Sequence, residues 1–343
     1  MPKISVILCA YNAEEFLADA VNSVLGQTFE DFELIIVNDG SRDSTPAVAS
    51  QFCQTDKRVR LVNIENGGLS NARNVGINEA TGDFIVFCDA DDTVDREALD
   101  VMYDAVCRDA TDLVICGYHH DTVKSDGTVS TVDFFEPSAV YNTREQLFSG
   151  IIGLKSKFIL DAGWNKLFRR SVIVDNGLNM AVGELFEDTD FVLSFLECSS
   201  KVSVLSDCFY HYVQRSNGSI TKRYDERKLR DLKKRHRRLA EFTLDADESV
   251  KRYVAFYYVK NVYSALANSF DSREMTRAER KTLFNKELGS TEFKTAVKGA
   301  KGVGLSDRLT VFVAKCPEWV GRIYCWGIHF MKSNLAELFA KLK

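Results

Sequence analysis

Short apolar runs alternate with amphipathic segments over the first 120 residues of the chain. The apolar runs lie at residues 4–9, 33–37, 59–64, 83–88 and 113–116, and each is nearly continuous. Segments with apolar residues at helical spacing lie between them, at residues 14–25, 47–52, 70–80 and 96–108. Continuous apolar strands that alternate with helices are typical of a parallel sheet covered on both faces. The pattern therefore predicts an α/β fold with a mostly parallel, Rossmann-like sheet.

Polar residues follow four of the predicted strands, at the point where each strand ends. Ligands of open α/β sheets bind beyond the carboxyl ends of the strands, so these residues are candidates for a site. The four segments are Ala10-Tyr11-Asn12, Asn38-Asp39-Gly40-Ser41, Glu65-Asn66-Gly67-Gly68 with Ser70–Asn74 after it, and Asp89-Ala90-Asp91-Asp92. A polar loop after one strand is common, and only the four segments together indicate a site.

The Asp89-Ala90-Asp91 segment has the most specific chemistry. Two carboxylates two residues apart at the end of a buried strand repel each other unless a cation or a hydrogen-bond donor offsets their charge. Mg²⁺ or Mn²⁺ takes one or two protein carboxylates and leaves phosphate oxygens to complete its shell. The segment therefore indicates a metal site for a phosphate-bearing ligand. In the alternative interpretation, Asp91 or Asp92 caps the helix that follows.

The last third of the chain has a different pattern. Beyond about residue 224 the strand-like runs stop, and helical patterns occupy residues 225–244, 249–270, 275–288 and much of 305–343. Charge changes at the same place. Residues 1–220 hold 17 Lys and Arg against 34 Asp and Glu, and residues 221–343 hold 27 against 15, within a net charge of −5. We therefore expect two domains, residues 1–222 and 223–343, with different partners.

Composition narrows the class of protein further. The chain has 343 residues, 45% of them hydrophobic, and only four prolines, which indicates a globular protein with ample core. Its nine cysteines form no CxxC pair and several lie in apolar runs, as expected for buried free thiols in a reducing compartment. The sequence has no signal-peptide pattern and no apolar run long enough to span a membrane, so we expect a cytoplasmic protein. GxxxxGK[ST] and GxGxxG motifs are absent, which argues against a phosphate-loop NTPase or a dinucleotide dehydrogenase.

Two ordered sets of motifs carry a family resemblance. The stretches ISVILCAYNAEEFLADAVNSVLGQTFEDFELIIVNDGSRDST and NGGLSNARNVGINEATGDFIVFCDADD closely resemble the N-terminal half of family 2 glycosyltransferases, over about residues 3–120. A second set, Gly163–Phe168, Phe186–Phe191 and Tyr210–Thr221, is similar to the bacterial subgroup that builds capsular, exopolysaccharide and other cell-envelope glycans. The resemblance implies a GT-A fold with a helical C-terminal region, inversion at the transferred sugar, and Mn²⁺ or Mg²⁺ as cofactor. It also implies a nucleotide-binding half at residues 1–120 and an acceptor-binding half at 121–222.

The resemblance assigns donor-binding roles to residues at the strand ends and in two later loops. The implied nucleotide-sugar-binding set is Ala10, Tyr11, Asn12, Asp39, Arg73, Asp89, Ala90, Asn165, Lys166, Arg215 and Ser219. Tyr11 would pack against the nucleobase, and Asp39 would accept a hydrogen bond from its N3–H, which favours uracil. Arg73 would contact the base or the diphosphate, Asp89 the ribose or the metal, and Asp91 the metal. The alternatives are a loop aromatic for Tyr11, a turn former for Asp39 and a solvated helix arginine for Arg73.

The catalytic and acceptor roles fall on the second set of motifs. Inversion in one displacement needs a general base on the face opposite the leaving group, and a carboxylate suits this role. By resemblance Asp188 is that base, while Glu187 binds the acceptor or assists. Trp164 would form an apolar floor for the acceptor sugar, and His211 would be a third metal ligand. In the alternatives, the two acids favour the dipole of a helix that starts there, Trp164 is a core residue, and His211 is an ordinary strand histidine.

We therefore expect an inverting, metal-dependent glycosyltransferase that moves a sugar from a UDP-sugar to a hydroxyl of a glycan or lipid-linked glycan, in cell-envelope or capsular polysaccharide synthesis. The alternative is a non-catalytic nucleotide-sugar-binding subunit of a polysaccharide assembly complex. A nucleotidyltransferase is disfavoured, because residues 10–12 form no basic, glycine-rich loop. The basic C-terminal helices fit either peripheral contact with the inner face of the cell membrane or a homo-oligomer interface. The acidic first domain argues against nucleic acid as a partner.

Overall fold

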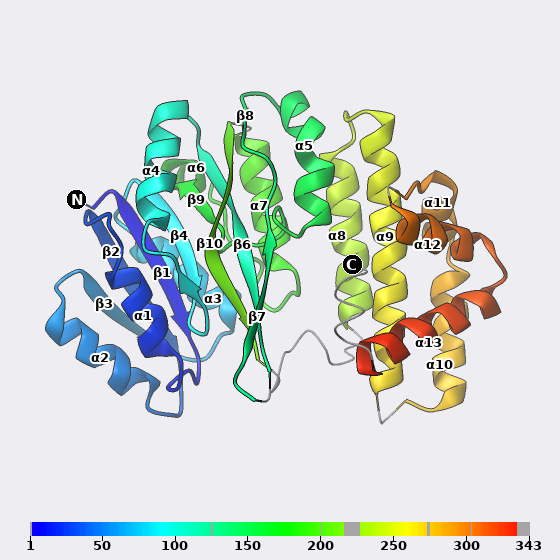
Figure 1. The fold of residues 1–343 in the computed structure, drawn as a ribbon, viewed down its shortest axis with the longest axis horizontal. Coiled ribbons are helices and arrows are strands. Elements are labelled where there is room, and N and C mark those ends of the chain that lie inside the picture. The colour runs from blue at the N-terminus through cyan, green and yellow to red at the C-terminus, as the bar shows by residue number, and fades with distance from the viewer. Residues whose placement is uncertain are drawn as a thin grey trace. The chain divides into compact units, whose positions relative to one another are not determined.

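The computed structural model describes residues 2–124, 126–199, 201–215, 227–272, 275–302 and 304–334, with side chains up to residue 331. The chain divides into two compact units, Met1–Gly218 and Ser219–Lys343 (Figure 1). In the described residues the first unit combines helices and strands, and the second unit is helical. The α/β class with a helical C-terminal region, expected from the sequence, is confirmed.

One large sheet forms the centre of the first unit. Its parallel half consists of β1 (Ile4–Ala10), β2 (Phe32–Asp39), β3 (Val59–Ile64) and β4 (Phe84–Asp89), in the spatial order β3-β2-β1-β4. Because these four strands run in the same direction, their carboxyl ends lie at one edge of the sheet. The four polar segments of the sequence therefore meet there.

The other half of the sheet is mixed. The sheet continues from β4 through β9 (Lys166–Arg169), β6 (Leu113–Val123), β10 (Val202–Gln214) and β5 (Thr93–Val94), while β7 (Val129–Phe134) pairs with β6 and β8 (Ala139–Tyr141) with β10. β9 runs antiparallel to both of its neighbours, and β10 runs parallel to β6. The register of β10 against β6 shifts twice, between Val204 and Cys208 and again before Tyr210. After these shifts His211 lies opposite His119.

Helices cover both faces of the parallel half, which explains its continuous apolar strands. The helices of this unit are α1 (Leu17–Leu25), α2 (Thr45–Thr55), α3 (Leu69–Glu79), α4 (Ala98–Asp109), α5 (Arg144–Ser156), α6 (Arg170–Asp175) and α7 (Glu187–Cys198). On one face, Val6 of β1 lines a small internal cavity together with Val24 of α1 and Leu99 of α4. On the other face, the Phe87 ring of β4 meets the Phe191 ring of α7 edge-on at 6.1 Å. Every position of β1 is accordingly buried.

A glycine brings α3 close to the sheet. A Cβ atom at Gly76 would lie 2.3 Å from Cγ2 of Ile7, so only glycine fits this contact between α3 and β1. Arg73 lies three residues earlier in α3, on the same face of the helix, and is itself buried. The close packing therefore holds the Arg73 side chain over the sheet.

The second half of the first unit departs from the sequence prediction. The strand predicted at residues 113–116 is too short, because β6 continues to Val123 through polar residues that pair with β7 on one side and β10 on the other. The short strands β5, β7, β8 and β9 and the helices α5 and α6 have no counterpart in the apolar pattern. Their residues alternate weakly or not at all, and pairing partners far away in the chain define them.

The C-terminal unit is built around one long helix. Its helices are α8 (Arg227–Phe242), α9 (Glu248–Asn268), α10 (Arg277–Leu288), α11 (Thr291–Gly299), α12 (Leu305–Lys315) and α13 (Glu318–Asn334), with the short 3₁₀ helix η2 (Ser269–Asp271) after α9. Helix α9 contacts α8, α11, α12 and α13. Buried residues occur all around α9, as expected for the central helix of a bundle. Among the described residues, no helix combines the length and the apolar character needed to cross a membrane.

Candidate active site

The strand ends of the parallel half bring Ala10, Asp39 and Asp89 to one edge of the sheet. Ala10 pairs with Asn38 in the neighbouring strand β2, and Asp89 pairs with Cys9 in β1. Tyr11 follows β1 and is about half exposed, at 49% of its surface. Its ring is therefore open to a ligand at the edge.

Three loops at this edge are joined by hydrogen bonds. The Asp39 carboxylate is buried and accepts hydrogen bonds from the backbone N–H groups of Gly67 and Gly68, at 2.8 and 2.9 Å. Asn12 has a left-handed backbone (φ 48°), and its side-chain oxygen accepts a hydrogen bond from the backbone N–H of Arg42 at 2.9 Å. The β1, β2 and β3 loops therefore form one connected rim.

Arg73 is the centre of a buried cluster of charges. Its side chain is only 2% exposed. One end of the guanidinium group, Nη2, donates to Asp89 Oδ1 at 2.8 Å, and the other end, Nη1, donates to Asp188 Oδ1. Glu187 Oε1 lies 3.9 Å from Nη1. One cation from α3 thus joins the end of β4 to the first turn of α7.

The cluster shifts the pKa values of its members. Burial alone would lower the pKa of Arg73, but Asp188 and Asp89 more than offset this effect and raise it above its ordinary value. Burial is also the main cause that raises the pKa of Asp188, and Arg73 opposes it. For Glu187, burial and then the charge of Asp188 raise the pKa to about 7. Three carboxylates around one guanidinium group carry more negative charge than it offsets, and Glu187 is the member closest to being neutral.

The three acids that follow β4 have different environments. Asp92 is buried and accepts hydrogen bonds from the Tyr210 hydroxyl and the Val213 backbone N–H, both at 2.8 Å. Asp91 is exposed, and its backbone carbonyl accepts a hydrogen bond from Arg215 Nη1 at 2.8 Å. Desolvation by nearby atoms and then the charge of Asp89 raise the pKa of Asp91. Asp92 therefore has a structural role in β5–β10 packing, while Asp91 presents its carboxylate outward.

The arrangement fits a divalent cation at Asp91. Within the described part of the chain, no hydrogen bond to the Asp91 carboxylate oxygens is found, so they are available to a ligand. The neighbouring Asp89 side chain is engaged by Arg73. Oxygen donors of this kind suit Mg²⁺ or Mn²⁺ with phosphate oxygens as further ligands. Arg215, which donates to the Asp91 carbonyl, is also stacked over the Phe16 ring at 4.0 Å.

Trp164, Asn165 and Lys166 lie in the interior in this structure. The Trp164 ring stacks on Tyr210 at 4.2 Å between centroids, and Tyr212 lies 5.7 Å away. The Asn165 amide donates to the Cys116 carbonyl at 2.8 Å, and Lys166 Nζ donates to the Ile159 carbonyl at 2.7 Å. Burial lowers the pKa of Lys166 to about 7. All three side chains thus brace the loop before β9, and their predicted contacts with donor or acceptor stay predictions.

The same loop touches the candidate base. The backbone N–H of Gly163 points at Asp188 Oδ2 at 3.4 Å, and a Cβ atom at Gly163 would lie 3.6 Å from the Asp188 carboxyl carbon. Trp164, the next residue, is locked by the aromatic stack. The loop therefore positions Asp188 from the side opposite Arg73.

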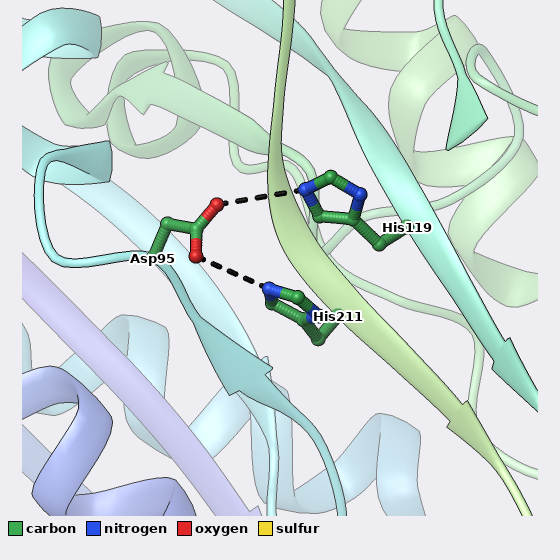
Figure 2. Close-up of side chains that lie close together, drawn as sticks. All are labelled: Asp95, His119 and His211. Carbon is green, nitrogen blue, oxygen red and sulfur yellow. Dashed lines mark hydrogen bonds and ion pairs between the residues drawn. The ribbon is translucent and has the colours of Figure 1, made fainter. Parts of the chain in front are cut away.

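His211 belongs to a cluster that contains neither Asp89 nor Asp91. Its Nδ1 atom lies 2.7 Å from Asp121 Oδ2, and its Nε2 atom lies 3.1 Å from Asp95 Oδ1 (Figure 2). Its ring stacks on that of His119 at 4.5 Å between centroids. The predicted role of His211 as a third ligand of the donor metal stays a prediction. Ser219 lies outside the described residues.

Tyr210 and the amides of Gly67 and Gly68 had no role predicted from the sequence. The Tyr210 hydroxyl joins the two sides of the site, because it donates to Asp92 and accepts a hydrogen bond from the Asp89 backbone N–H at 3.1 Å. Its position in an alternating strand was visible in the sequence, but its partner was not. The glycine amides could have been suspected from the Gly67-Gly68 turn directly after a strand.

Comparisons with known proteins identify relatives of this chain. Residues 5–176 match the family model described as Glycosyl transferase family 2. The putative glycosyltransferase EpsH of Bacillus subtilis is 34% identical over 233 residues, which cover 66% of this chain and 64% of EpsH. The chain thus spans less than two thirds of the length of this relative.

Two solved structures have a similar fold. The crystal structure of S. aureus TarS 1-349 in complex with UDP-GlcNAc has a TM-score of 0.66 at 20% identity, covering 95% of this chain and 92% of that chain. The mannosyltransferase PcManGT from Pyrobaculum calidifontis, solved with GDP-Man and Mn²⁺, has a TM-score of 0.52 at 15% identity, covering 92% of this chain and 86% of that chain.

The likeness to these structures shows a GT-A fold, an α/β domain with a mostly parallel sheet, joined here to a helical C-terminal region. The chain belongs to glycosyl transferase family 2.

Proposed function

We propose that this protein is an inverting, metal-dependent glycosyltransferase that transfers a sugar from a UDP-sugar to a hydroxyl group of a glycan or lipid-linked glycan. The observation that carries the proposal is the double contact of Arg73 with Asp89 and Asp188. An inverting transfer needs a donor site and a base that reach the same anomeric carbon from opposite sides. The Arg73 guanidinium group holds one candidate for each, at the two ends of one planar group.

On the donor side, the nucleotide lies across the strand ends. The exposed Tyr11 ring offers a face to the base, and Ala10 and Asn12 shape the floor beside it. Asp39, fixed by two backbone amides, accepts the N3–H of uracil with a lone pair that those amides leave open. Neutral cytosine has no proton at N3, so this contact selects uridine nucleotides. The crystal structure of the similar TarS fragment with UDP-GlcNAc supports the same choice of base.

The diphosphate lies beside Asp89, Ala90 and Asp91. A divalent cation held by Asp91, with Asp89 as a further ligand, supplies Lewis-acid stabilisation of the departing diphosphate when it is bound. Arg215, anchored on the Asp91 carbonyl, adds a positive charge on the same side. Ser219, which lies outside the described residues, contributes a hydroxyl group to the diphosphate in this proposal. Asn165 and Lys166 contribute indirectly, because their hydrogen bonds to the Ile159 carbonyl hold the loop next to Asp188 in place.

On the acceptor side, Asp188 is the general base. Its Oδ1 atom is held by Arg73. Its Oδ2 atom accepts only the long hydrogen bond from the Gly163 N–H and keeps a lone pair for the proton of the acceptor hydroxyl, as the new C–O bond forms and the bond to the diphosphate breaks. Glu187, next to it, hydrogen-bonds the acceptor, and its raised pKa lets it donate as well as accept. Trp164, stacked on Tyr210, forms the apolar floor under the acceptor sugar.

The acceptor is a growing cell-envelope or capsular polysaccharide, or its lipid-linked precursor. The family and the similarity to EpsH support this assignment. The alternative function, a nucleotide-sugar-binding subunit without turnover, is disfavoured because Asp89, Asp91 and Asp188 are all present at the site.

The C-terminal unit has a surface that suits peripheral attachment to an anionic membrane. Exposed apolar side chains form one row on α12 and another on α13, at helical spacing: Leu305, Leu309 and Phe312, then Trp319, Ile323 and Trp326. Arg308 and Lys315 are exposed beside the first row. Tryptophan and basic residues around an apolar row favour the interface of anionic lipids. Flotation of wild type and Trp319→Ser/Trp326→Ser with anionic vesicles tests this surface, and concentration-dependent self-association without flotation would assign it to an oligomer instead.

Release of UDP from UDP-sugars, measured with Mg²⁺ or Mn²⁺ and a panel of glycan acceptors, tests the catalytic function. We expect wild-type turnover and a loss of 10²–10⁴-fold in Asp188→Asn, the range for a general base. Asp190→Asn, in the same helical turn, is the matched control and should retain activity. Calorimetry with UDP separates the alternatives. Binding of UDP without turnover of any UDP-sugar, in wild type and Asp188→Asn alike, would identify a binding subunit.

A further inference from the structure

A second cluster of side chains that can bind a metal lies on β6, β10 and the loop before α4. Asp95, His119 and His211 each offer one ligand atom, and these atoms all lie within 4.8 Å of one another. His119 Nε2 lies 3.5 Å from Asp95 Oδ2, and His211 Nε2 lies 3.1 Å from Asp95 Oδ1 (Figure 2). Both imidazole rings therefore direct the same nitrogen at one carboxylate.

The other nitrogen of each ring is held from behind by its own carboxylate. His119 Nδ1 lies 2.7 Å from Asp133 Oδ1, and His211 Nδ1 lies 2.7 Å from Asp121 Oδ2. Asp121 is in turn bound by the Thr131 hydroxyl. Metal-binding histidines have this arrangement, in which a carboxylate takes the Nδ1–H, fixes the tautomer and makes Nε2 the ligand.

Protonation alone does not give every ring nitrogen of His119 and His211 a favourable partner. They stack at 4.5 Å between centroids with planes 28° apart, so two imidazolium cations would repel each other at close range. With both Nδ1–H groups donated to Asp133 and Asp121, the neutral rings direct two lone pairs at the Asp95 oxygens, which also repels. His119 Nε2 lies 3.1 Å from the Cys208 carbonyl oxygen as well, so a proton on it has an acceptor there, but a neutral His211 still directs a lone pair at a carboxylate. A cation between the three groups removes both costs.

We propose that Asp95, His119 and His211 form a binding site for a transition-metal ion such as Zn²⁺, separate from the donor-site metal. Two imidazoles and one carboxylate are a donor set that favours Zn²⁺ over Mg²⁺, which prefers oxygen ligands. Three protein ligands leave a fourth position for solvent. Binding requires the three ligand atoms to close in, because the edges of a tetrahedral zinc site are roughly 3–4 Å long for bonds of about 2 Å.

Alternation along β10 separates this site from the candidate active site. Tyr210 and Tyr212 stack with Trp164, whereas His211 between them stacks with His119. Successive side chains of a strand point to opposite faces, so the histidine pair and the aromatic stack lie on different sides of the sheet. The metal would tie the segment after Asp91 to β6 and β10, because Asp95 is only four residues further on. This effect is structural, and it does not depend on the proposed transfer reaction.

Cys208 does not belong to the proposed ligand set. It lies near His119 and Asp133 and could form a second group with them. Burial raises the pKa of its thiol to about 11, and the thiol donates to the Phe134 carbonyl at 3.7 Å. The Cys208 group shares only His119 with the cluster of Asp95, His119 and His211 and is separate from it.

Zinc titration of the metal-free protein, residues 1–343, followed by calorimetry and thermal unfolding, tests the site. The assay uses Asp91→Asn as its background, which removes the donor-site carboxylate. We expect one Zn²⁺ bound per chain, a rise in the unfolding temperature and, with Co²⁺ instead, the visible absorption of a tetrahedral site. His119→Gln/His211→Gln should lose all three signals.

His120→Gln is the matched control, because His120 is the neighbour of His119 in β6 and packs near Tyr212 on the other side of the sheet. It should bind Zn²⁺ as the background protein does. Far-UV circular dichroism checks that each variant is folded, and His211→Gln alone serves if the double variant is not. Absence of stoichiometric binding, or binding that survives His211→Gln in a folded protein, overturns the proposal. UDP release is not read in this experiment, so its outcome is independent of the catalytic proposal.

Discussion

Two clusters of charged side chains in the α/β unit each contain three carboxylates, but they differ in the cationic group that the carboxylates surround. Around Arg73 lie the carboxylates of Asp89, Glu187 and Asp188. Around the histidine pair lie the carboxylates of Asp95, Asp121 and Asp133, at contact distances of 2.7–3.5 Å. In each cluster, three carboxylates surround the cationic groups: the guanidinium group of Arg73 in the first and the two imidazoles in the second.

The difference lies in whether the positive charge is permanent. Arg73 is charged at every pH at which the protein is folded, and its burial makes it an integral part of the core. The imidazoles of His119 and His211 are charged only when protonated, or act as ligands when neutral. The first cluster therefore always contains a positive charge. The second gains one only when it takes up a proton or a metal ion from solution.

The largest difference is expected for removal of the permanent cation. Arg73→Met leaves three half-buried carboxylates without their buried partner, and removal of one member of a buried ion pair costs about 3–5 kcal/mol. His211→Gln leaves groups that are partly exposed and keeps a hydrogen-bond donor, so it should cost less than about 1 kcal/mol in metal-free buffer. Urea unfolding at pH 7 measures both. Equal losses would contradict the distinction between the two clusters.

Ligand binding should separate the clusters next. Asp91→Asn should weaken Mn²⁺-dependent binding of UDP by roughly tenfold or more, equal to about 1.4 kcal/mol. His211→Gln should leave UDP binding unchanged, because its cluster shares no residue with the Asp89-Ala90-Asp91 segment. Calorimetry with UDP and Mn²⁺ checks both. A parallel loss in His211→Gln would mean that His211 serves the donor metal, as the family resemblance implies.

The smallest effect on stability is expected when one carboxylate, Glu187, is removed from the Arg73 cluster. The pKa of Glu187 is raised to about 7 in the folded protein, against an ordinary value near 4.5. A raised carboxyl pKa favours the folded state when the group is protonated, and this contribution is lost as pH rises from about 4.5 through 7. Glu187→Gln should therefore stabilise the protein by about 1 kcal/mol at pH 8 and have almost no effect at pH 4. Thermal unfolding across this range shows whether the gain grows with pH, and a flat difference contradicts the shift.

The parallel half of the sheet could be predicted from the sequence, and the mixed half could not. Every position of β1 and β2 is buried, so their apolar runs mark the strands and their ends almost to the residue. β9 has four residues and lies between β4 and β6 because of pairing across more than 40 residues. No local pattern encodes such a pairing.

The same limit applies to the site. The acids at the ends of β4 and at the start of α7 were identified from their motifs, but their convergence on Arg73 depends on how α3 packs against β1. His211 was singled out as a metal-binding residue, whereas Asp95 and His119 were not, because their proximity depends on the register of β10 against β6. Residue type suggests chemistry, and only long-range packing selects the partners.

The two register shifts in β10 make this strand sensitive to insertions and deletions. β10 has three more residues than β6 between the pairs Val204–Ile115 and Tyr210–Tyr118. If one residue were lost between Val204 and Tyr210, every later side chain of β10 would exchange sides unless the irregular stretch absorbed the change. The tyrosines would then face His119, and His211 would face Trp164. In a related enzyme that differs by one residue in this stretch, the tyrosine and histidine positions of β10 would therefore lie on exchanged faces of the sheet without any substitution.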